Sequence, residues 1–519
     1  MVIAMDIPSN HNTFVSSSIV ASIQRILPVA CLIVLALILF VPFGTRNLPL
    51  VEEWMLIEGG NQDGGLFYTP VGHESRPLQS SLYYIAYLLD PVGFTGFPLM
   101  LAALFLLKGI VIWGLMRRLV PQYRELAFLT AVLYLVMPAD QGVFITRPIN
   151  IHGASLLYFV ALYCLLTAVN AKTRLLPVVF GMMVALAASL LMYDAGYPLA
   201  LLSPAILLIA PRGTPARGRF VVVAWTSVVF LCVLFKWILV AGSAAAYQQM
   251  VFDSPTVLNA LYPVALSIVR HFMVGWLEAI PLLPSSFAYL VLAGISGVGA
   301  IWVLSTLFPA RIPAYRLAVQ RLLPLFMLGV AILVLGVAAH IVSIYRYSDW
   351  RMYYYASLGG AMSVAVAVML VRSRYGQRFA LIVTGALIVL GVVHALHQQA
   401  AFVEDSDAAR ALLNDTRSQL ASVAPGTTIV YLNYPPGGTL HRDMFYHHGY
   451  LVSALRVVNP GYQGLREAYV CRVGQCEVTA STINVRLNAS DTVYLLRQNV
   501  RLFDYSPSEG YVLQTSKAF

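Results

Sequence analysis

The sequence predicts an all-α domain that crosses a membrane many times, followed by a small soluble α/β domain. Hydrophobic residues make up 59% of the 519 positions and the mean hydropathy is +0.75, whereas an ordinary soluble domain is roughly 45–50% apolar. Apolar runs recur through residues 1–399. Most are about 17–25 residues long, enough to cross ~30 Å of hydrocarbon as a helix. From about residue 400 the runs become short and alternating.

We expect eleven membrane-spanning helices in the first domain. The expected spans are residues 27–43, 98–116, 126–138, 152–169, 175–192, 196–210, 220–241, 287–308, 322–343, 354–371 and 379–396. Residues 1–18 contain neither a basic segment nor a small-residue cleavage site. A removed signal peptide is therefore not expected, and the first span is expected to stay as an anchor.

The basic residues predict which way the spans run. Lysine and arginine are concentrated in five short loops, at about residues 116–124, 170–174, 211–219, 309–321 and 372–378. All five fall on one side of the eleven-span arrangement, and an excess of these residues marks the cytoplasmic side. The amino terminus is then inside and the carboxyl terminus outside. The net charge of +10 is explained by this topology, so no nucleic-acid partner is expected.

Two long outer loops are expected, at residues 44–97 and 243–286. The second is apolar enough to suggest a span, but it contains Arg270, His271 and Glu278. Counting it as a span would move the basic loop at 309–321 to the outer face. We therefore expect an interfacial or re-entrant helix there.

The second domain covers residues 400–519 and is expected on the outer face. A helical segment is followed by short alternating segments separated by glycine and proline turns, which is typical of strands. Cys471 and Cys476 lie close together in this domain. A disulfide is the favoured interpretation outside the cytoplasm. Free thiols and a metal-binding pair are the alternatives.

The stretch from Leu48 to Leu78 is unusually rich in ionisable groups for a chain in which only 11% of residues are charged. Two interpretations compete: a solvated surface loop, or a catalytic loop on the outer face of the membrane. Its ionisable residues are Glu52, Glu53, Glu58, Asp63, His73, Glu74 and Arg76.

Further charges stand at the outer ends of other spans, at Asp140, Asp194, Arg346, Asp349 and Arg351. Each has an ordinary explanation as a solvated or snorkelling interfacial side chain. A charge buried at this depth is costly unless it is paired, which favours a functional role. Carboxylates can accept the proton of an attacking hydroxyl, and arginine can hold a phosphate with two parallel hydrogen bonds. One face of the protein would therefore carry both halves of a phosphate-releasing transfer site.

This pattern resembles the GT-C superfamily of integral membrane glycosyltransferases, which use polyprenyl-phosphate-linked sugars on the outer face. The resemblance is carried by Glu52-Glu53-Trp54 after the first span, Arg76-Pro77-Leu78, the turn Pro138-Ala139-Asp140, Asp194, the segment 346–351 and the outer carboxyl-terminal domain. It implies Glu53 or Glu52 as the catalytic base, Asp140 as a second acidic residue, and Arg346 or Arg351 as the ligand of the donor phosphate. It also implies inversion at the anomeric carbon by direct displacement.

The remaining expectations complete this interpretation. Arg76 is expected at the donor phosphate, and a divalent cation, Mg²⁺ or Mn²⁺, is left open with Glu52, Asp140 and His73 as its candidate ligands. The expected partners are a polyprenyl-phosphate sugar donor, a lipid-linked, polysaccharide or protein acceptor, and membrane lipid. The expected location is a bacterial inner membrane. The alternative functions are a transporter or flippase of a lipid-linked saccharide, or a polysaccharide ligase. Substrate-binding residues are expected at His73, Glu74, Asp194, Arg270 and Tyr345.

Overall fold

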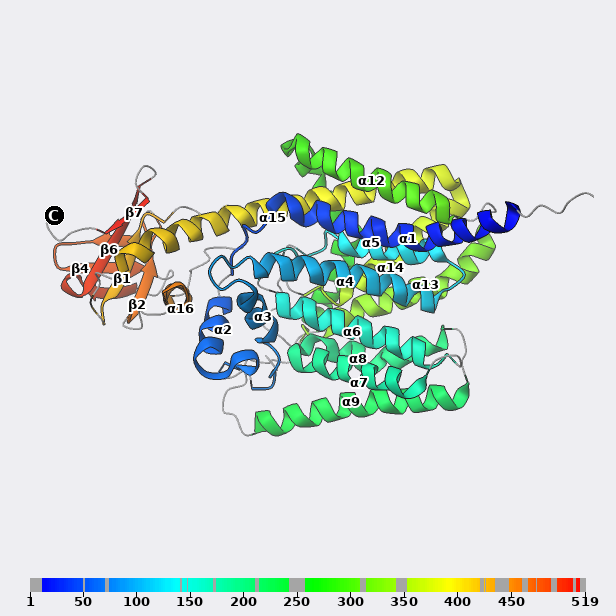
Figure 1. Ribbon diagram of the computed structural model, residues 1–519, viewed down its shortest axis with the longest axis horizontal. Helices are drawn as coiled ribbons and strands as arrows, with labels where there is room; N and C mark the ends of the chain where they lie inside the picture. The colour runs from blue at the N-terminus through cyan, green and yellow to red at the C-terminus, as the bar shows by residue number, and fades with distance from the viewer. Residues whose placement is uncertain are drawn as a thin grey trace, which may run out of the picture.

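The protein is a bundle of long helices with a smaller domain at one end (Figure 1). A computed structural model describes residues 12–49, 52–70, 74–140, 142–146, 148–170, 174–210, 214–241, 257–308, 314–341, 352–420, 424, 426–434, 448–459, 465–472, 474–486, 492–506 and 510–513. The two-part fold predicted from the sequence is confirmed.

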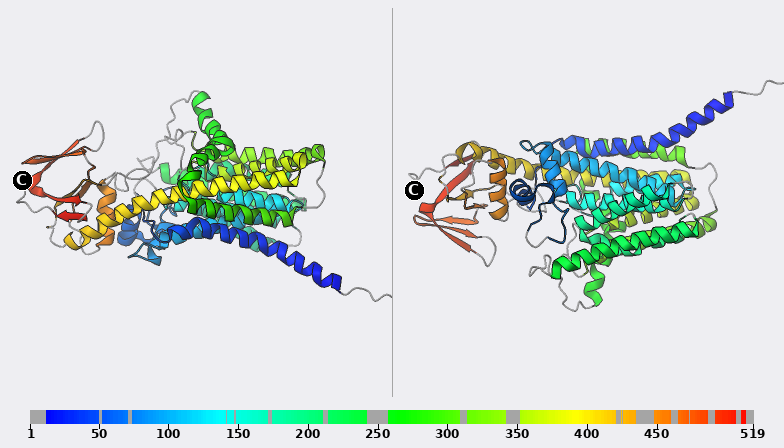
Figure 2. Two further views of the ribbon diagram at one scale, coloured as in Figure 1. Left: turned by 90° about the horizontal axis from the view of Figure 1, so that it is seen from above. Right: turned by 60° about the horizontal axis from the view of Figure 1, so that its bottom comes forward.

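The long helices lie side by side along the bundle (Figures 1 and 2). They are α1 (Asn12–Phe40), α4 (Gly96–Leu119), α6 (Ile149–Ala168), α7 (Leu175–Met192), α9 (Pro215–Ala241), α12 (Phe287–Leu307), α13 (Tyr315–Ala338), α14 (Ala356–Tyr375) and α15 (Gln377–Leu420). Within the described ranges, ten segments are long and apolar enough to cross a membrane. Large apolar side chains such as Phe180 and Val298 are exposed on the bundle surface, as expected where lipid surrounds the protein. The chain is an integral multi-pass membrane protein.

Two of the eleven expected spans are corrected by the structure. Residues 126–138 form only the short helix α5 (Arg124–Leu135), and residues 196–210 form α8 (Tyr197–Leu202) with a 3₁₀ segment, Ser203–Leu208. Every residue of α5 from Glu125 to Leu135 is buried by neighbouring parts of the protein. Apolar composition alone could not separate these short helices from lipid-crossing ones, because burial in protein selects the same residues as burial in lipid.

The segment expected to be interfacial or re-entrant is also helical. It consists of α10 (Val257–Val269), a π-helical turn (Arg270–Val274), α11 (Gly275–Ala279) and a 3₁₀ segment (Ile280–Ser285). Its part Leu261–Ser285 is long and apolar enough to cross a membrane. Figure 2 shows α10 running crosswise to the long helices, at the end of the bundle nearer the second domain. The interfacial placement of this segment stays a prediction.

The two ends of the bundle differ in character. The connections α4–α5, α6–α7, α8–α9, α12–α13 and α14–α15 lie in the five basic regions of the sequence and join helices at the end away from the second domain. The opposite end carries α2 (Glu52–Gly59) and α3 (Ser81–Leu89), which Figure 1 shows between the bundle and the second domain. The charged stretch that follows the first span therefore lies at the end opposite the basic loops.

The second domain contains two small sheets and one helix. Its elements are β1 (Thr428–Leu432), α16 (His448–Val458), β2 (Glu467–Val470), β3 (Cys476–Val478), β4 (Thr482–Arg486), β5 (Thr492–Leu496), β6 (Val500–Ser506) and β7 (Gly510–Leu513). One sheet has the order β2-β1-β6-β7, with β1 parallel to β2 and β6; the other is antiparallel, in the order β3-β4-β5. Cys471 and Cys476 are paired in a disulfide, with 5.6 Å between their Cα atoms.

Helix α15 connects the two parts without a break. It continues through residue 400, where the sequence suggested a boundary, and ends at Leu420. Its Asp415 accepts a hydrogen bond from the Tyr511 backbone (3.1 Å), and its Gln419 accepts one from the Leu513 backbone (2.9 Å). These bonds cover backbone donors on the edge strand β7, so the same helix that crosses the bundle also completes the second domain.

The close packing of α13 against α14 leads to a prediction about stability. A Cβ atom on Gly359 would collide with the Gly329 carbonyl oxygen and the Leu333 backbone nitrogen. Gly359→Ala should therefore lower the free energy of unfolding by about 1–3 kcal/mol, the usual cost of overpacking. Thermal unfolding of the purified protein in detergent measures the change. The matched control is Gly294→Ala on α12, where a Cβ would have nothing within 4 Å; an equal loss there would contradict the explanation.

Candidate functional site

A buried loop between α5 and α6 organises the end of the bundle that faces the second domain. Its carbonyl oxygens cannot be left unpaired away from water, because each unsatisfied group would cost several kcal/mol in an apolar environment. Side chains from four other segments supply the partners. The bonded pairs are Arg270 Nε with Ala139 O (2.7 Å), Gln398 Nε2 with Asp140 O (3.1 Å), Tyr354 OH with Gly142 O (3.1 Å) and His152 Nε2 with Val143 O (2.8 Å).

Glu53 lies next to this loop. The Thr146 hydroxyl is 3.1 Å from Glu53 Oε2 and 3.0 Å from the Leu48 carbonyl oxygen. Glu53 is only 1% exposed, whereas Glu52 is half-buried. Both stand in the first turn of α2, where the exposed backbone N–H groups favour negative charge. The structure thus separates two neighbours that the sequence left equivalent: Glu53 faces the buried loop.

Asp140 is part of the loop itself and is also 1% exposed. Its carboxylate accepts hydrogen bonds from the backbone N–H of Gly142 (2.8 Å) and of Tyr353 (3.4 Å). Burial and then the negative charge of Asp140 raise the pKa of Tyr354 well above its ordinary value. Tyr354 therefore stays protonated and keeps donating to Gly142. Asp140 links the loop to the start of α14.

Arg270 holds the loop from the other side. It is 4% exposed, and its guanidinium is 2.7 Å and 3.3 Å from the two carboxylate oxygens of Glu278. The π-helical turn begins at Arg270, and such turns often occur at functional sites. Gly275, one turn on, lies against the Pro138 carbonyl, where a Cβ would collide. The geometry makes Arg270 a positioning residue of the loop, and its expected contact with substrate stays a prediction.

A cluster of charges lies between α7 and α9. Arg76 Nε is 2.5 Å from Asp194 Oδ2, and Lys236 forms an ion pair with the other oxygen of the same carboxylate. Arg76 is 6% exposed, and its guanidinium lies 5.3 Å from the centre of the Tyr193 ring. Two basic side chains therefore contact one carboxylate. A guanidinium beside such a site can also donate charge-assisted hydrogen bonds to an anion such as a phosphate.

Tyr354 and His340 are each influenced by one of the two groups of charges. The carboxylate of Asp140 helps to raise the pKa of Tyr354. His340, which follows the last turn of α13, is buried, and burial followed by the positive charge of Arg76 lowers its pKa to about 4. His340 is therefore neutral near pH 7 and adds no charge to the Arg76 cluster.

Several site residues were missed by the sequence reasoning. Lys236 and Lys108 lie inside expected spans, and Lys108 Nζ is 2.5 Å from Nδ1 of His152 in the buried interior. The missed signal is simple: an ionisable residue within a membrane segment is a functional candidate by default. The sequence also did not indicate that Tyr354 and Gln398 belong to the site, because their roles depend on contacts with a loop distant in the sequence.

Some expected site residues fall outside the described residues, namely His73, Tyr345, Arg346 and Arg351. Their roles stay predictions. Glu74 is exposed. Within the part of the chain that the structure describes, no group of three or more His, Cys, Asp or Glu side chains could hold a metal ion. His73, one of the three candidate cation ligands, is among the residues not described.

Comparison with known proteins gives similarities to solved structures. No family model and no curated protein matches the sequence. The chain is similar to ArnT from Cupriavidus metallidurans bound to undecaprenyl phosphate, at 15% identity and a TM-score of 0.42, over 83% of this chain and 84% of that one. It is also similar to the apo oligosaccharyltransferase of Archaeoglobus fulgidus, at 13% identity and a TM-score of 0.44, over 86% and 64% of the two chains.

A third similar structure is the arabinofuranosyltransferase AftD from Mycobacteria, at 15% identity and a TM-score of 0.39, over 79% of this chain and 30% of that one.

The buried His340 predicts how stability depends on pH. Its pKa is about 4 in the folded protein, below the ordinary 6.5, so the unfolded chain binds more protons between these values. Stability should be complete above pH 6.5 and fall as the pH drops toward 4, on the order of 2–3 kcal/mol in total. Thermal unfolding between pH 7.5 and about 4.5 tests this. His340→Gln should reduce the loss of stability at low pH, and an unchanged profile would contradict the assignment.

Proposed function

We propose that this protein is a membrane glycosyltransferase that moves a sugar from a polyprenyl phosphate to an acceptor hydroxyl. One observation carries the proposal: a buried carboxylate, Glu53, and two basic side chains, Arg76 and Lys236, lie at the same end of the bundle, the end that carries α2 and α3. These are the two kinds of group that sugar transfer from a phosphate requires. The donor class follows from the sequence resemblance.

The reaction is a single displacement. The acceptor oxygen attacks the anomeric carbon of the donor sugar and forms the new glycosidic bond, while its proton passes to the carboxylate of Glu53. The bond from the anomeric carbon to the phosphate oxygen breaks, and its electron pair leaves with the polyprenyl phosphate. Arg76 and Lys236 stabilise the negative charge that develops on that phosphate. Attack from the face opposite the leaving group inverts the anomeric configuration.

The other residues position these groups. Asp140, bonded to the backbone of Gly142 and Tyr353, holds the loop that carries Thr146. Thr146 in turn orients Glu53. Arg346 and Arg351 are proposed as further phosphate ligands on the strength of the sequence resemblance. We also propose that His73, Glu74 and Tyr345 contact the substrate, as expected from the sequence.

The membrane setting suits a lipid-linked donor. Its polyprenyl chain dissolves in the hydrocarbon beside the bundle, while its phosphate reaches the charged end of the helices. The basic loops at the opposite end of the bundle support an outer-face location for this end, by the positive-inside rule. We propose a bacterial inner membrane, with the amino terminus in the cytoplasm and the second domain outside. The acceptor is a lipid-linked glycan, a polysaccharide or a protein.

Replacing the proposed base should abolish turnover. Glu53→Gln keeps the shape of the side chain but cannot accept the proton, so kcat should fall by roughly 10²–10⁴-fold, the usual contribution of a general base. The assay follows release of polyprenyl phosphate, and the sugar product, from a synthetic polyprenyl-phosphate sugar and purified protein. A flippase would release no phosphate in this assay.

Glu52→Gln is the matched control for this substitution. It removes the same charge one residue away, from a half-buried side chain, and should retain most of the activity. Full activity of Glu53→Gln, or an equal loss in both variants, would overturn the assignment of Glu53.

Replacing the proposed phosphate ligand should also slow the chemical step. Arg76→Gln removes one cation from the cluster, and kcat should fall by roughly 10²–10³-fold if the guanidinium stabilises the leaving phosphate. Arg217→Gln at the basic end of the bundle, where the side chain bonds to the Asn170 carbonyl, should have little effect. If Arg76→Gln turned over at the normal rate, Arg76 would have no role in phosphate stabilisation.

A further inference from the structure

A cavity of about 380 Å³ lies at the junction of the bundle with the second domain, outside the charged site described above. Its walls come from four separate parts of the chain: Leu48 before α2, Tyr87 of α3 with residues 91–94 after it, the outer part of α15, and the end of α16. The volume is within the range of roughly 300–1,000 Å³ typical of small-molecule sites.

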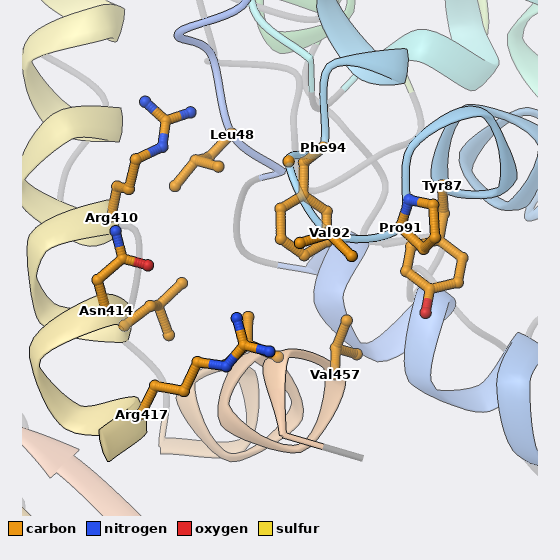
Figure 3. A pocket seen from close by; sticks show the side chains of 12 residues that line it. Leu48, Tyr87, Pro91, Val92, Phe94, Arg410, Asn414, Arg417 and Val457 are labelled. Atoms are coloured by element: carbon orange, nitrogen blue, oxygen red, sulfur yellow. The ribbon is translucent and has the colours of Figure 1, made fainter. Parts of the chain in front are cut away.

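One wall of the cavity is polar and basic. Arg410, Asn414 and Arg417 are spaced four and three residues apart on α15, which puts them on one face of the helix. Figure 3 shows Arg417 and Asn414 reaching from α15 into the space, with Arg410 beside Leu48. None of the described residues that line the cavity is acidic.

The two arginines differ in how they are held. Arg410 donates to the Arg46 carbonyl oxygen (3.1 Å) and is 3.5 Å from Asp407, a carboxylate that Arg46 also contacts. Arg417 and Asn414 are exposed to solvent. In the described part of the chain no hydrogen bond or ion pair to the Arg417 guanidinium is found. Arg417 can therefore turn its donors toward a ligand that enters from the solvent.

The opposite wall is apolar and partly aromatic. It is formed by Tyr87, Pro91, Val92 and Phe94, which Figure 3 shows across the space from α15. Aromatic and aliphatic surfaces of this kind pack against the C–H faces of a sugar ring, while guanidinium groups bind phosphate or carboxylate oxygens with charge-assisted hydrogen bonds. The two walls together suit a saccharide that carries an anionic group.

The cavity adjoins the proposed base. Leu48 lines the cavity, and its carbonyl oxygen accepts a hydrogen bond from the same Thr146 hydroxyl that binds Glu53. The end of α16 forms part of the cavity wall. Arg456 of α16 also forms an ion pair, at 3.0 Å, with Glu58 of α2, the helix that carries Glu53. A ligand here would contact Leu48, which shares the Thr146 hydroxyl with Glu53.

We infer that this cavity binds the acceptor, and that the acceptor is a saccharide bearing a phosphate or carboxylate group held by Arg417 and Arg410. The acceptor role rests on the proposed glycosyltransferase function. The binding of an anionic saccharide does not, because it follows from the cavity and its charges alone.

Binding of three soluble probes tests the inference: glucose 6-phosphate, glucuronate and uncharged glucose. Each is titrated against the full-length protein in nanodiscs and followed by ligand-observed NMR. At least one charged sugar should bind roughly tenfold or more tightly than glucose, because a charge-assisted hydrogen bond adds that much affinity. The stronger of the two charged probes identifies the anionic group. Binding of neither charged sugar to the wild type, or equal binding of all three probes, would overturn the inference.

Variants link that binding to the cavity. Arg417→Gln should lower the affinity for the charged sugars by roughly tenfold and leave that for glucose unchanged. Asn414→Asp, which adds a negative charge on the same helix face, should do the same. Arg501→Gln, an exposed arginine of β6 that does not line the cavity, is the control. Unchanged affinity in both cavity variants would overturn the site.

The two proposals fail separately. Probe binding needs neither donor nor turnover, so a protein that binds charged sugars through Arg417 but never cleaves a polyprenyl-phosphate sugar would refute the transferase and keep the site. A protein that transfers sugar normally, with no dependence on Arg417 for probe binding, would refute the site and keep the transferase.

Discussion

The structure depends most on hydrogen bonds to the backbone carbonyl oxygens of one buried loop, the loop between α5 and α6. The described residues between α5 and α6, 136–140, 142–146 and 148, are all buried in protein apart from the half-buried Val143, so their carbonyl oxygens have little access to water. Arg270, Tyr354, Gln398 and His152 each donate to one of these carbonyls. Since an unpaired carbonyl would be costly there, the loop draws the crosswise helix and the starts of α6 and α14 toward a common point. The proposed active site forms around that point.

The charges at this end are kept in two groups that do not neutralise one another. Glu53 is held by the neutral hydroxyl of Thr146, and Asp140 by backbone N–H groups. Asp194 instead lies between two cations, Arg76 and Lys236. A base must retain basicity toward an incoming hydroxyl, and a phosphate ligand must retain positive charge. Direct pairing of Glu53 with Arg76 would have reduced both. The protonated phenol of Tyr354 lies in electrostatic reach of Asp140.

Helix α15 gives the membrane part and the second domain a common rigid element. It contributes Gln398 to the buried loop, Ser406 to the Leu48 backbone, the basic wall of the cavity, and finally the partners of strand β7. The second domain is therefore held next to α2 by the same helix that carries part of the site. This arrangement supports a role for the second domain in shaping the acceptor side of the reaction.

The sequence by itself determined the class of protein, the basic end of the bundle, a separate carboxyl-terminal α/β domain and the segments that carry Glu53, Asp140, Asp194 and Arg76. These follow from composition and local charge, which are properties of short stretches. Tertiary structure alone decided that α5 and α8 are short internal helices and that Glu53, not Glu52, faces the loop. It also decided that Lys236 shares Asp194 with Arg76. Those facts depend on which distant segments are in contact. Two helices with the same apolar composition can be covered either by lipid or by protein, so composition does not distinguish them.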